Sequence, residues 1–351
     1  MPSSMTDPAG PRATPTPPTS AAVARRAGVS RATVSYVLNG QAAGRVGERT
    51  QAKVRAAAEE LGYVPHAAAR SLRAGRGSIV LLAAPADTAP AFGSLFTSFL
   101  AGFQTALHGL GYTVVLHGAP AAAPLAAARA WAELRPAAVL TLDAPPPDAA
   151  AVALLRRSGT AAVLTHGPPA APGAHTLLLD QHEAGRAAGA HLLARGRRRI
   201  GVIRPAEPGL ARFADPRLAG VRSAAAAHPD AVVRPLDLAL TEHSAAQLAA
   251  AWPDLGLDAV FAYNDEYAML LMRALQDAGH ALGTAPDGIG VVGADDLLLG
   301  RLLRPRLTTV RAEIIPPERI AALVDRLIRT PDTAPAAHRL GTFAVVARDS
   351  G

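Results

Sequence analysis

A three-residue turn between two short helix-forming runs is the feature that most constrains this chain. The turn lies within GVSRATVSYVLNG, residues 28–40. Gly28 can end a helix over residues 20–27, because glycine readily adopts the left-handed conformation that follows a helix end. Ser30 can cap a second helix over residues 31–38 with its side-chain oxygen. The stretch therefore predicts two helices that cross at a tight turn, which is a helix-turn-helix unit.

The second of these helices has one apolar face and one polar face. Val34, Val37 and Leu38 point toward the first helix. A third helix is expected over about residues 49–61, closed by Gly62. A polar face on a short helix of this kind can meet the edges of base pairs in the major groove of DNA. The residues on that outer face are Arg31, Ala32, Ser35 and Tyr36.

The positive charge of the chain is concentrated around these helices. Residues 19–76 hold ten Arg and Lys residues against three acidic ones, whereas residues 77–351 hold 24 of each sign. The formal net charge of +7 therefore belongs to the short segment, which is suited to a polyanion. A membrane surface is the weaker candidate, because the small apolar faces of these helices are used in packing on each other. Double-stranded DNA is the expected partner, and a purely structural helical hairpin would not need the charge.

Several classes of protein are disfavoured by what the sequence lacks. It contains no cysteine, which excludes disulfides and thiolate zinc sites and fits a cytoplasmic protein. No apolar run approaches the ~20 residues of a membrane span, and residues 1–18 suggest a disordered tail, not a signal peptide. The histidines do not have metal-ligand spacing, and neither a phosphate-binding loop nor a nucleophile elbow is present. We therefore expect no enzyme activity, no metal and no cofactor.

From residue 78 onward, short apolar strands alternate with Ala-rich helices. Such a pattern is typical of α/β proteins with doubly wound parallel sheets, and about 275 residues favour two lobes with a cleft between them. Ligands bind such sheets at the carboxyl ends of the strands, where His166, Asn264 and Asp295 lie. The expected strands cover residues 78–84, 113–118, 137–142, 160–166, 199–205, 258–264 and 289–295.

Several longer stretches carry a family resemblance. They are VARRAGVSRATVSYVLNG (23–40), AAEELGYVPHAAARSL (57–72), GRAAGAHLLARGRRRIGVI (185–203), RLAG (217–220), VFAYND (260–265), GIGVVGADD (288–296) and RPRLTTV (304–310). In this order and spacing they resemble the LacI/GalR family of transcriptional regulators. After the disordered tail over 1–18, the resemblance implies a helix-turn-helix DNA-binding domain over 19–64, a hinge helix over 65–76, and an effector-binding and dimerisation domain over 77–351. The last of these would have the two-lobed fold of periplasmic binding proteins.

The resemblance also implies which residues contact DNA. The hinge segment is too short to form a stable helix alone, so we expect it to order only on DNA beside a second copy. Leu72 matches a family leucine that pries open the central base step in the minor groove; the alternative is that it packs on its own effector domain. Tyr36 stands where several family members have Arg, and a phenol cannot make the bidentate contact that Arg gives to guanine. The expected DNA-binding residues are Ser30, Arg31, Ala32, Thr33, Ser35, Tyr36, Asn39, His66, Ala69, Arg70, Leu72 and Arg73.

A second group of residues is expected at the effector site. Arg217, Asn264 and Asp295 match family residues that hydrogen-bond a small polar effector, and together they suit hydroxyl groups or a heterocycle. His166 ends a strand at the cleft. Phe96 and Asp143 match positions near its mouth. Arg217 could instead pair within its own lobe, and only one of Asp295 and Asp296 can face the cleft.

The implied protein is a cytoplasmic, nucleoid-associated repressor that binds a palindromic operator as a homodimer and responds to a small molecule, with sugars the family's common ligands. Two alternatives stay open. A solute-binding protein or enzyme of the same fold would not need the basic head. A regulator that senses no ligand is also compatible, because Ala83, Ala84 and Ala294 place small side chains around the expected cleft.

Overall fold

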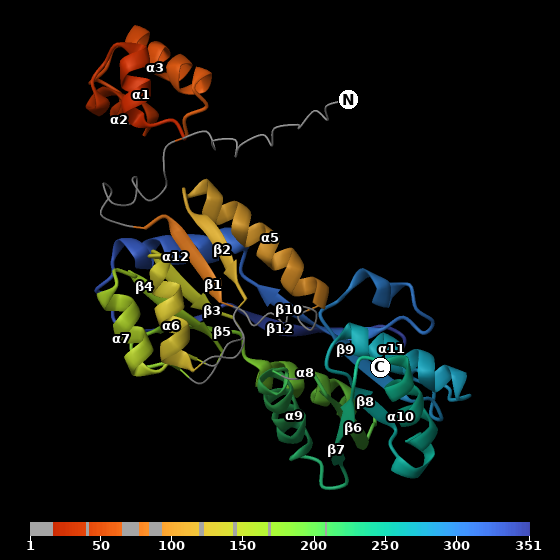
Figure 1. Cartoon of the computed structure of the whole chain (residues 1–351). Helices are drawn as coiled ribbons and strands as arrows, with labels where there is room; N and C mark the ends of the chain where they lie inside the picture. Colours follow the sequence, from red (N-terminus) through yellow and green to blue (C-terminus); the bar gives the residue numbers. More distant parts are fainter. Residues whose placement is uncertain are drawn as a thin grey trace, which may run out of the picture. The chain divides into compact units, whose positions relative to one another are not determined.

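The computed structural model describes residues 17–39, 42–64, 77–83, 93–118, 123–142, 146–167, 170–207 and 209–351, with the backbone alone for residues 93–96. Contacts divide the chain into two units, Met1–Gly77 and Ser78–Gly351 (Figure 1). The small unit is helical and the large one is an α/β unit with two six-stranded sheets. The predicted fold class is confirmed, whereas the finer divisions after residues 18, 64 and 76 stay predictions.

The described residues of the small unit, 17–39 and 42–64, form a bundle of three helices, α1 (Ser20–Ala27), α2 (Arg31–Leu38) and α3 (Glu48–Glu60). The Ser30 hydroxyl caps α2 by accepting from the Thr33 amide at 3.1 Å. Gly28 ends α1 in the left-handed conformation. The third helix begins one residue earlier than predicted, with Glu48 in its first turn, where a carboxylate interacts favourably with the helix dipole. Buried residues of the three helices form one core, namely Val23, Ala24, Val34, Val37, Ala42, Val54, Ala57 and Ala58.

The first lobe of the large unit is a parallel sheet of strand order β11-β5-β4-β3-β1-β2. Helices α5 and α12 pack on one face of this sheet, and α6 and α7 cover the other (Figure 1). Its central strands are buried on both faces, as expected for a parallel sheet between helices. The elements are β1 (Ile79–Ala83), α5 (Gly93–Gly109), β2 (Thr113–His117), α6 (Pro124–Glu133), β3 (Ala138–Thr141), α7 (Ala149–Arg157), β4 (Ala162–His166), β5 (His175–Leu178), α12 (Pro317–Arg329) and β11 (Ala337–Arg339).

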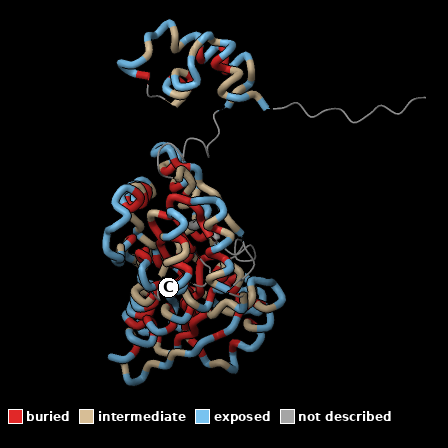
Figure 2. The backbone as a smooth tube through the Cα atoms, turned by 60° about the vertical axis from the view of Figure 1, so that its left-hand side comes forward, coloured by how far each residue is buried: buried red, intermediate tan, exposed pale blue. Residues whose placement is uncertain are grey.

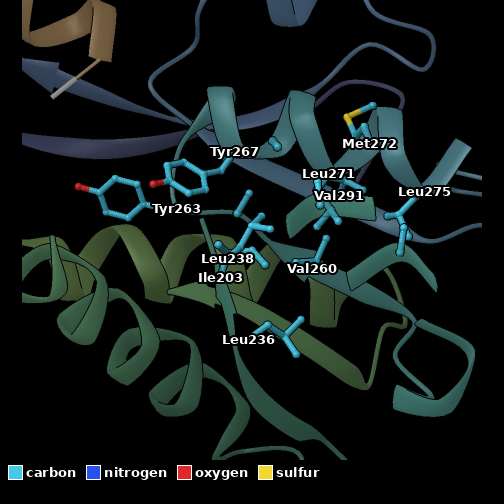
Figure 3. Packing of buried hydrophobic residues seen from close by; sticks show 14 of the residues in the cluster. Ile203, Leu236, Leu238, Val260, Tyr263, Tyr267, Leu271, Met272, Leu275 and Val291 are labelled. Carbon is cyan, nitrogen blue, oxygen red and sulfur yellow. The ribbon is translucent and has the colours of Figure 1, made fainter. Parts of the chain in front are cut away.

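The second lobe has the strand order β12-β10-β9-β8-β6-β7, parallel except for the pairing of β10 with β12. Its two cores lie on opposite faces of the sheet, one under α8 and α9 and one under α10 and α11. Figure 3 shows the second core, where Leu271 and Leu275 of α11 meet Val260 and Val291 of the sheet. The elements are α8 (Gln181–Ala194), β6 (Arg199–Pro205), α9 (Ala211–Ala225), β7 (Val232–Leu238), α10 (Glu242–Leu255), β8 (Ala259–Phe261), α11 (Asp265–Asp277), β9 (Gly290–Ala294), the 3-10 helix η2 (Leu298–Arg301), β10 (Thr308–Ile314) and β12 (Gly341–Val346).

The chain passes between the lobes three times, after β5, after β10 and between β11 and β12. The three passages are hydrogen-bonded side by side. The Leu340 amide donates to the Leu178 carbonyl at 2.7 Å, and the Ile315 amide donates to the Leu340 carbonyl at 2.8 Å. Figure 2 shows that buried residues gather in the interior of the large unit, whereas exposed residues lie at its outside. The two lobes are therefore joined by a ribbon of adjacent strands, which permits bending without loss of the connection.

Helices α8 and α9 approach so closely that their backbones touch. A side chain at Gly185 would overlap the carbonyl oxygen of Arg217, and one at Gly220 would overlap that of His182. A Cβ at Gly189 would lie 3.1 Å from the Cα of Val221. Only glycine allows this crossing, because backbone atoms cannot move aside as a flexible side chain can.

We expect Gly185→Ala and Gly220→Ala each to lower the free energy of unfolding by about 1–3 kcal/mol or more, because the added methyl group forces the two helices apart. Unfolding in urea can be followed by tryptophan fluorescence, since Trp131 and Trp252 both lie buried in the large unit. Gly109→Ala is the matched control.

Gly109 ends α5, and a Cβ there meets open space. This control should be neutral or slightly stabilising, by up to about 1 kcal/mol. If Gly185→Ala and Gly220→Ala unfold at the same urea concentration as the parent, the close backbone contact between α8 and α9 does not constrain the fold.

Candidate functional site

The outer face of α2 presents the side chains that the sequence assigns to DNA contact. Arg31, Ala32 and Tyr36 are exposed, and the guanidinium of Arg45 lies 5.5 Å from the centre of the Tyr36 ring. Tyr36 is therefore placed beside a cation at the surface, where a phosphate group could approach both. An exposed arginine and a phenol beside a second arginine form a polar, positively charged surface.

The remaining residues of this face take part in local hydrogen bonds. The hydroxyl groups of Ser30 and Thr33 lie 2.9 Å apart, and Asn39 donates to the Ser35 hydroxyl at 3.0 Å. These bonds fix the side chains in place, so the surface is ordered before it meets a ligand. The predicted hinge residues His66, Ala69, Arg70, Leu72 and Arg73 lie outside the described residues.

A cavity of about 150 Å³ lies between the two lobes, at the carboxyl ends of the strands. Four of the six predicted effector residues line it, namely His166, Arg217, Asn264 and Asp295. Phe96 lies on α5, where its side chain is not described, and Asp143 lies outside the described residues. The other lining residues are Phe99, Leu140, Leu142, Leu177, Leu179, Gln181, Phe213, Tyr263, Ile314 and Leu340.

Arg217 is held in the cavity wall by three contacts. Its Nε donates to the Gln181 side-chain oxygen at 2.8 Å, and its Nη1 donates to the Tyr263 carbonyl. Its guanidinium also lies 4.8 Å from the centre of the Tyr263 ring. Gln181 is held in turn by a bond to the Leu179 carbonyl at 3.2 Å. The arginine is thus paired within its lobe and also lines the cavity.

Asn264 also has a structural role. It is the residue before α11, and its Oδ1 accepts from the Tyr267 amide at 3.0 Å, which caps the helix. Its Nδ2 lies 3.4 Å from Glu266 Oε2. The amide lines the cavity while it caps the helix, so its oxygen is already engaged before a ligand arrives.

The two aspartates that follow β9 lie in different surroundings. Asp295, with a φ of 102°, lines the cavity. Burial raises its pKa, and the charge of Arg217 opposes that rise. Asp296 lies among Arg348, Arg301 and Arg311; burial alone would raise its pKa, but these arginines lower it. Asp295 is therefore the member of the pair that can contact a ligand.

His166 stands at the end of β4 beside a second small hollow. Its ring lies 5.8 Å from that of Phe213. Burial lowers the pKa of His166 to about 4, with a further contribution from the charge of Arg212, so the imidazole is neutral at pH 7. The hollow and the main cavity have four lining residues in common, His166, Leu179, Gln181 and Phe213. The other residues that line the hollow are Gly167, Leu178, Asp180, Arg212 and Pro216.

Asp265, the first residue of α11, forms hydrogen bonds with two neighbouring segments. Its carboxylate is fully buried and accepts from the Thr309 hydroxyl at 2.6 Å and the Leu297 amide at 2.7 Å. Burial raises the pKa of Asp265 to about 7, against the effect of these two hydrogen bonds, and nearby Asp295 and Asp296 add to the rise. The segment after β9 is thus anchored to α11 and β10 by a titratable group.

Sequence reasoning missed ten of the fourteen residues that line the cavity. Tyr263 directly precedes Asn264 at the end of β8, so the rule that ligands bind at strand ends could have included it. Gln181 follows β5, a strand that the sequence reading did not identify. The leucines could not be assigned, because a core leucine and a cavity leucine look alike in sequence.

Other kinds of site were also sought. Among the described residues, no group of three or more His, Asp or Glu side chains could hold a metal ion. No helix in the described part of the chain is long and apolar enough to cross a membrane.

Known proteins match both units. The family model described as "Bacterial regulatory proteins, lacI family" matches residues 21–66, and that of a "Periplasmic binding protein-like domain" matches residues 190–351. The HTH-type transcriptional regulator CelR of Thermobifida fusca is 31% identical over 350 residues, which cover 95% of this chain and 98% of CelR.

Two solved structures share the fold across almost the whole chain. A complex of the transcriptional regulator CelR with cellobiose is 26% identical, with a TM-score of 0.62, and the match covers 95% of this chain and 100% of that one. The lac repressor dimer bound to operator and the anti-inducer ONPF is 23% identical, with a TM-score of 0.77, and the match covers 95% and 99% of the two chains.

The contribution of Asp265 to the stability of the chain should fall between pH 5 and pH 8. The unfolded chain releases this proton near pH 4 and the folded chain near pH 7, so the folded state binds more protons in between. The contribution to stability is full below pH 4 and is lost as the pH rises through 7. Asp265→Asn removes the titration. The unfolding free energy of the parent minus that of the variant should therefore fall by about 2–3 kcal/mol from pH 5 to pH 8.

Asp349→Asn serves as the control for this measurement. The hydrogen bond from Arg306 lowers the pKa of Asp349, so this residue stays ionised throughout the range and its replacement should leave the pH dependence unchanged. If the difference in unfolding free energy between the parent and Asp265→Asn stays constant from pH 5 to pH 8, the buried carboxyl group does not titrate in that range.

Proposed function

The chain belongs to the lacI family of bacterial regulatory proteins, which are DNA-binding transcriptional regulators, and we propose that it acts as a homodimeric, ligand-responsive repressor. In this proposal α2 reads a palindromic operator, the cavity between the lobes binds a small effector, and the protein catalyses no reaction. It works in the cytoplasm, associated with the nucleoid, and needs no metal or cofactor.

The placement of charge and polar side chains supports operator binding. All of the net positive charge lies in residues 19–76. The exposed face of α2 offers Arg31 and Tyr36 for contacts with DNA, with Arg45 beside them. Cationic side chains bind phosphates and set the register, while residues of the recognition helix contact base edges. The hinge residues, with Leu72 as a wedge in the minor groove, belong to this proposal.

The cavity between the lobes is the observation that carries the effector role. Arg217, Asn264 and Asp295 bring donors and acceptors to one side of the cavity, as small-molecule sites require. The related regulator CelR has been solved in complex with cellobiose. We propose that the effector here is a sugar or a related small metabolite with hydrogen-bonding groups.

An exposed apolar surface supports self-association. Leu298, Leu299 and Leu302 have exposed fractions of 69%, 58% and 66% along and just after η2. Exposed apolar patches mark protein interfaces, and a two-fold dimer would present two helix-turn-helix units to two half-sites. The lac repressor was solved as a dimer on its operator.

The coupling between effector and DNA follows from the three connections between the lobes. A ligand that binds better to one arrangement of the lobes shifts the population toward it. If that arrangement changes the spacing of the two hinge segments in the dimer, operator affinity changes by a coupling free energy of typically about 1–3 kcal/mol.

Selection from a random DNA pool with the full-length chain should enrich a palindrome with half-sites about one helical turn apart. Operator affinity should fall steeply with salt, because each neutralised phosphate adds about −0.9 to the log–log slope. A fragment that starts at Ser78 should not bind. Enrichment of an asymmetric half-site with monomer stoichiometry, or equal binding by the fragment, would refute the proposal.

Two substitutions should separate the DNA and effector roles. Leu72→Ala should lower operator affinity strongly and barely change affinity for random DNA, because the wedge is lost while phosphate contacts remain. Arg217→Ala should leave operator binding intact and abolish the effector response. Arg222→Ala is the control for the latter, because Arg222 is an exposed residue on the same helix. Parent-like operator affinity in Leu72→Ala, or a full response in Arg217→Ala, would show that the assignment is wrong.

A further inference from the structure

The turn that leads into α3 holds the backbone of Arg45 in a defined place. The amides of Arg45 and Val46 both donate to the Ala42 carbonyl at 3.0 Å, and Ala42 is buried in the core of the small unit. The Gln51 side chain donates to the Val46 carbonyl at 2.8 Å, which ties the turn to α3. The Arg45 side chain therefore starts from a fixed point.

The side chain of Arg45 extends from this turn to the outer face of α2. Its guanidinium carbon lies over the Tyr36 ring, 5.5 Å from the ring centre, and both residues are exposed. A guanidinium is attracted to the face of an aromatic ring, and this contact limits the rotamers that a long side chain would otherwise sample. The surface that contains Arg31, Ala32 and Tyr36 thus also carries a guanidinium from another segment.

The kind of contact that holds Arg45 leaves its hydrogen-bond donors usable. Arg26 is held by an ion pair with Glu60 at 2.7 Å, and Arg55 donates to the Gln51 side chain at 3.2 Å. Those contacts use N–H groups of the guanidinium. A ring acts instead on the charge of the guanidinium through the ring face, and the N–H fork at the edge remains able to bind a ligand.

This guanidinium lies where the recognition helix itself has no arginine. Guanine presents two acceptors in the major groove, O6 and N7, and the fork of an arginine can donate to both at once. The hydroxyl of Tyr36 has a single hydrogen to donate. The turn before α3 therefore brings to position 36 the donor pair that a tyrosine lacks.

We propose that Arg45 contacts a guanine base in each operator half-site and that Tyr36 is the positioning residue that holds its guanidinium. This inference rests on the proposed operator binding, to which it assigns one base contact. Two segments, α2 and the turn before α3, then share the task that one arginine of the recognition helix performs in several members of the family.

Titrations with altered duplexes test this base contact. Selection from a random DNA pool with the full-length chain gives the preferred duplex, and each G·C pair of both half-sites is then replaced by A·T in turn. For the parent, the replacement at one such pair per half-site should lower affinity by about tenfold or more, as for a bidentate arginine–guanine contact. In Arg45→Ala the same replacement should change affinity less than about twofold, while preferences at the other base pairs remain.

Further variants separate the base contact from charge and from packing. Arg45→Lys keeps the charge without the fork, so it should lose most of the preference and keep its affinity for random DNA. Tyr36→Phe keeps the ring and should keep the preference. Tyr36→Ala should reduce the preference roughly threefold, which is the worth of a cation–π contact at the surface. Arg55→Ala is the matched control, because it removes an exposed arginine of the same unit and should leave every base preference unchanged.

The proposal is overturned if Arg45→Ala weakens binding to all duplexes by the same factor, because the side chain then contacts a phosphate group. Loss of the preference in Tyr36→Phe would also overturn it, since the hydroxyl and not the ring would then act, as would full retention in Tyr36→Ala. Circular dichroism checks that each variant is folded. A parent that selects no palindrome would refute operator binding itself, whereas an unchanged palindrome selected by Arg45→Ala would reject the base contact alone.

Discussion

The contact between the backbones of α8 and α9 is the constraint on which the effector site depends. Gly185 and Gly220 allow the two helices to touch, and the atom that would meet a side chain at Gly185 is the carbonyl of Arg217 itself. This approach brings Gln181, the first residue of α8, within hydrogen-bonding distance of the Arg217 guanidinium. A wider crossing would separate the pair and leave a buried cation without its partner, which is costly. The packing of two helices thus fixes the main cation of the cavity.

The polar residues of the cavity hold the fold together as well as facing a ligand. Asn264 caps α11, and Arg217 joins α9 to α8 and to the carbonyl of Tyr263. These bonds keep the side chains in one rotamer, so little conformational entropy is lost when a ligand binds. The same bonds consume hydrogen-bonding capacity, which restricts the ligand to groups that Arg217 and Asp295 can still satisfy. Rigidity and selectivity therefore have the same origin in this site.

The sequence predicts those parts of the structure that follow from local rules. The Ser30 cap, the Gly28 stop and the alternation of apolar strands with helices gave the helix-turn-helix and the two-lobed class. Strands β5, β7, β10, β11 and β12 were missed. β7 contains Pro235, which suits an edge strand, and β10 and β11 contain charged residues that interrupt an apolar run. Gln181 was missed with them, because its role depends on a contact with a residue 36 positions away.

A buried carboxylate connects the cavity to the exposed leucines. Asp295 lines the cavity, and two residues further on the Leu297 amide donates to Asp265. Leu298 and Leu299 follow immediately at the surface. A short segment thus carries both a ligand-facing group and the apolar patch assigned to dimerisation. In the proposed function, a ligand held by Asp295 acts on the same segment that meets the second copy, and linkage requires that dimerisation affects ligand affinity in return.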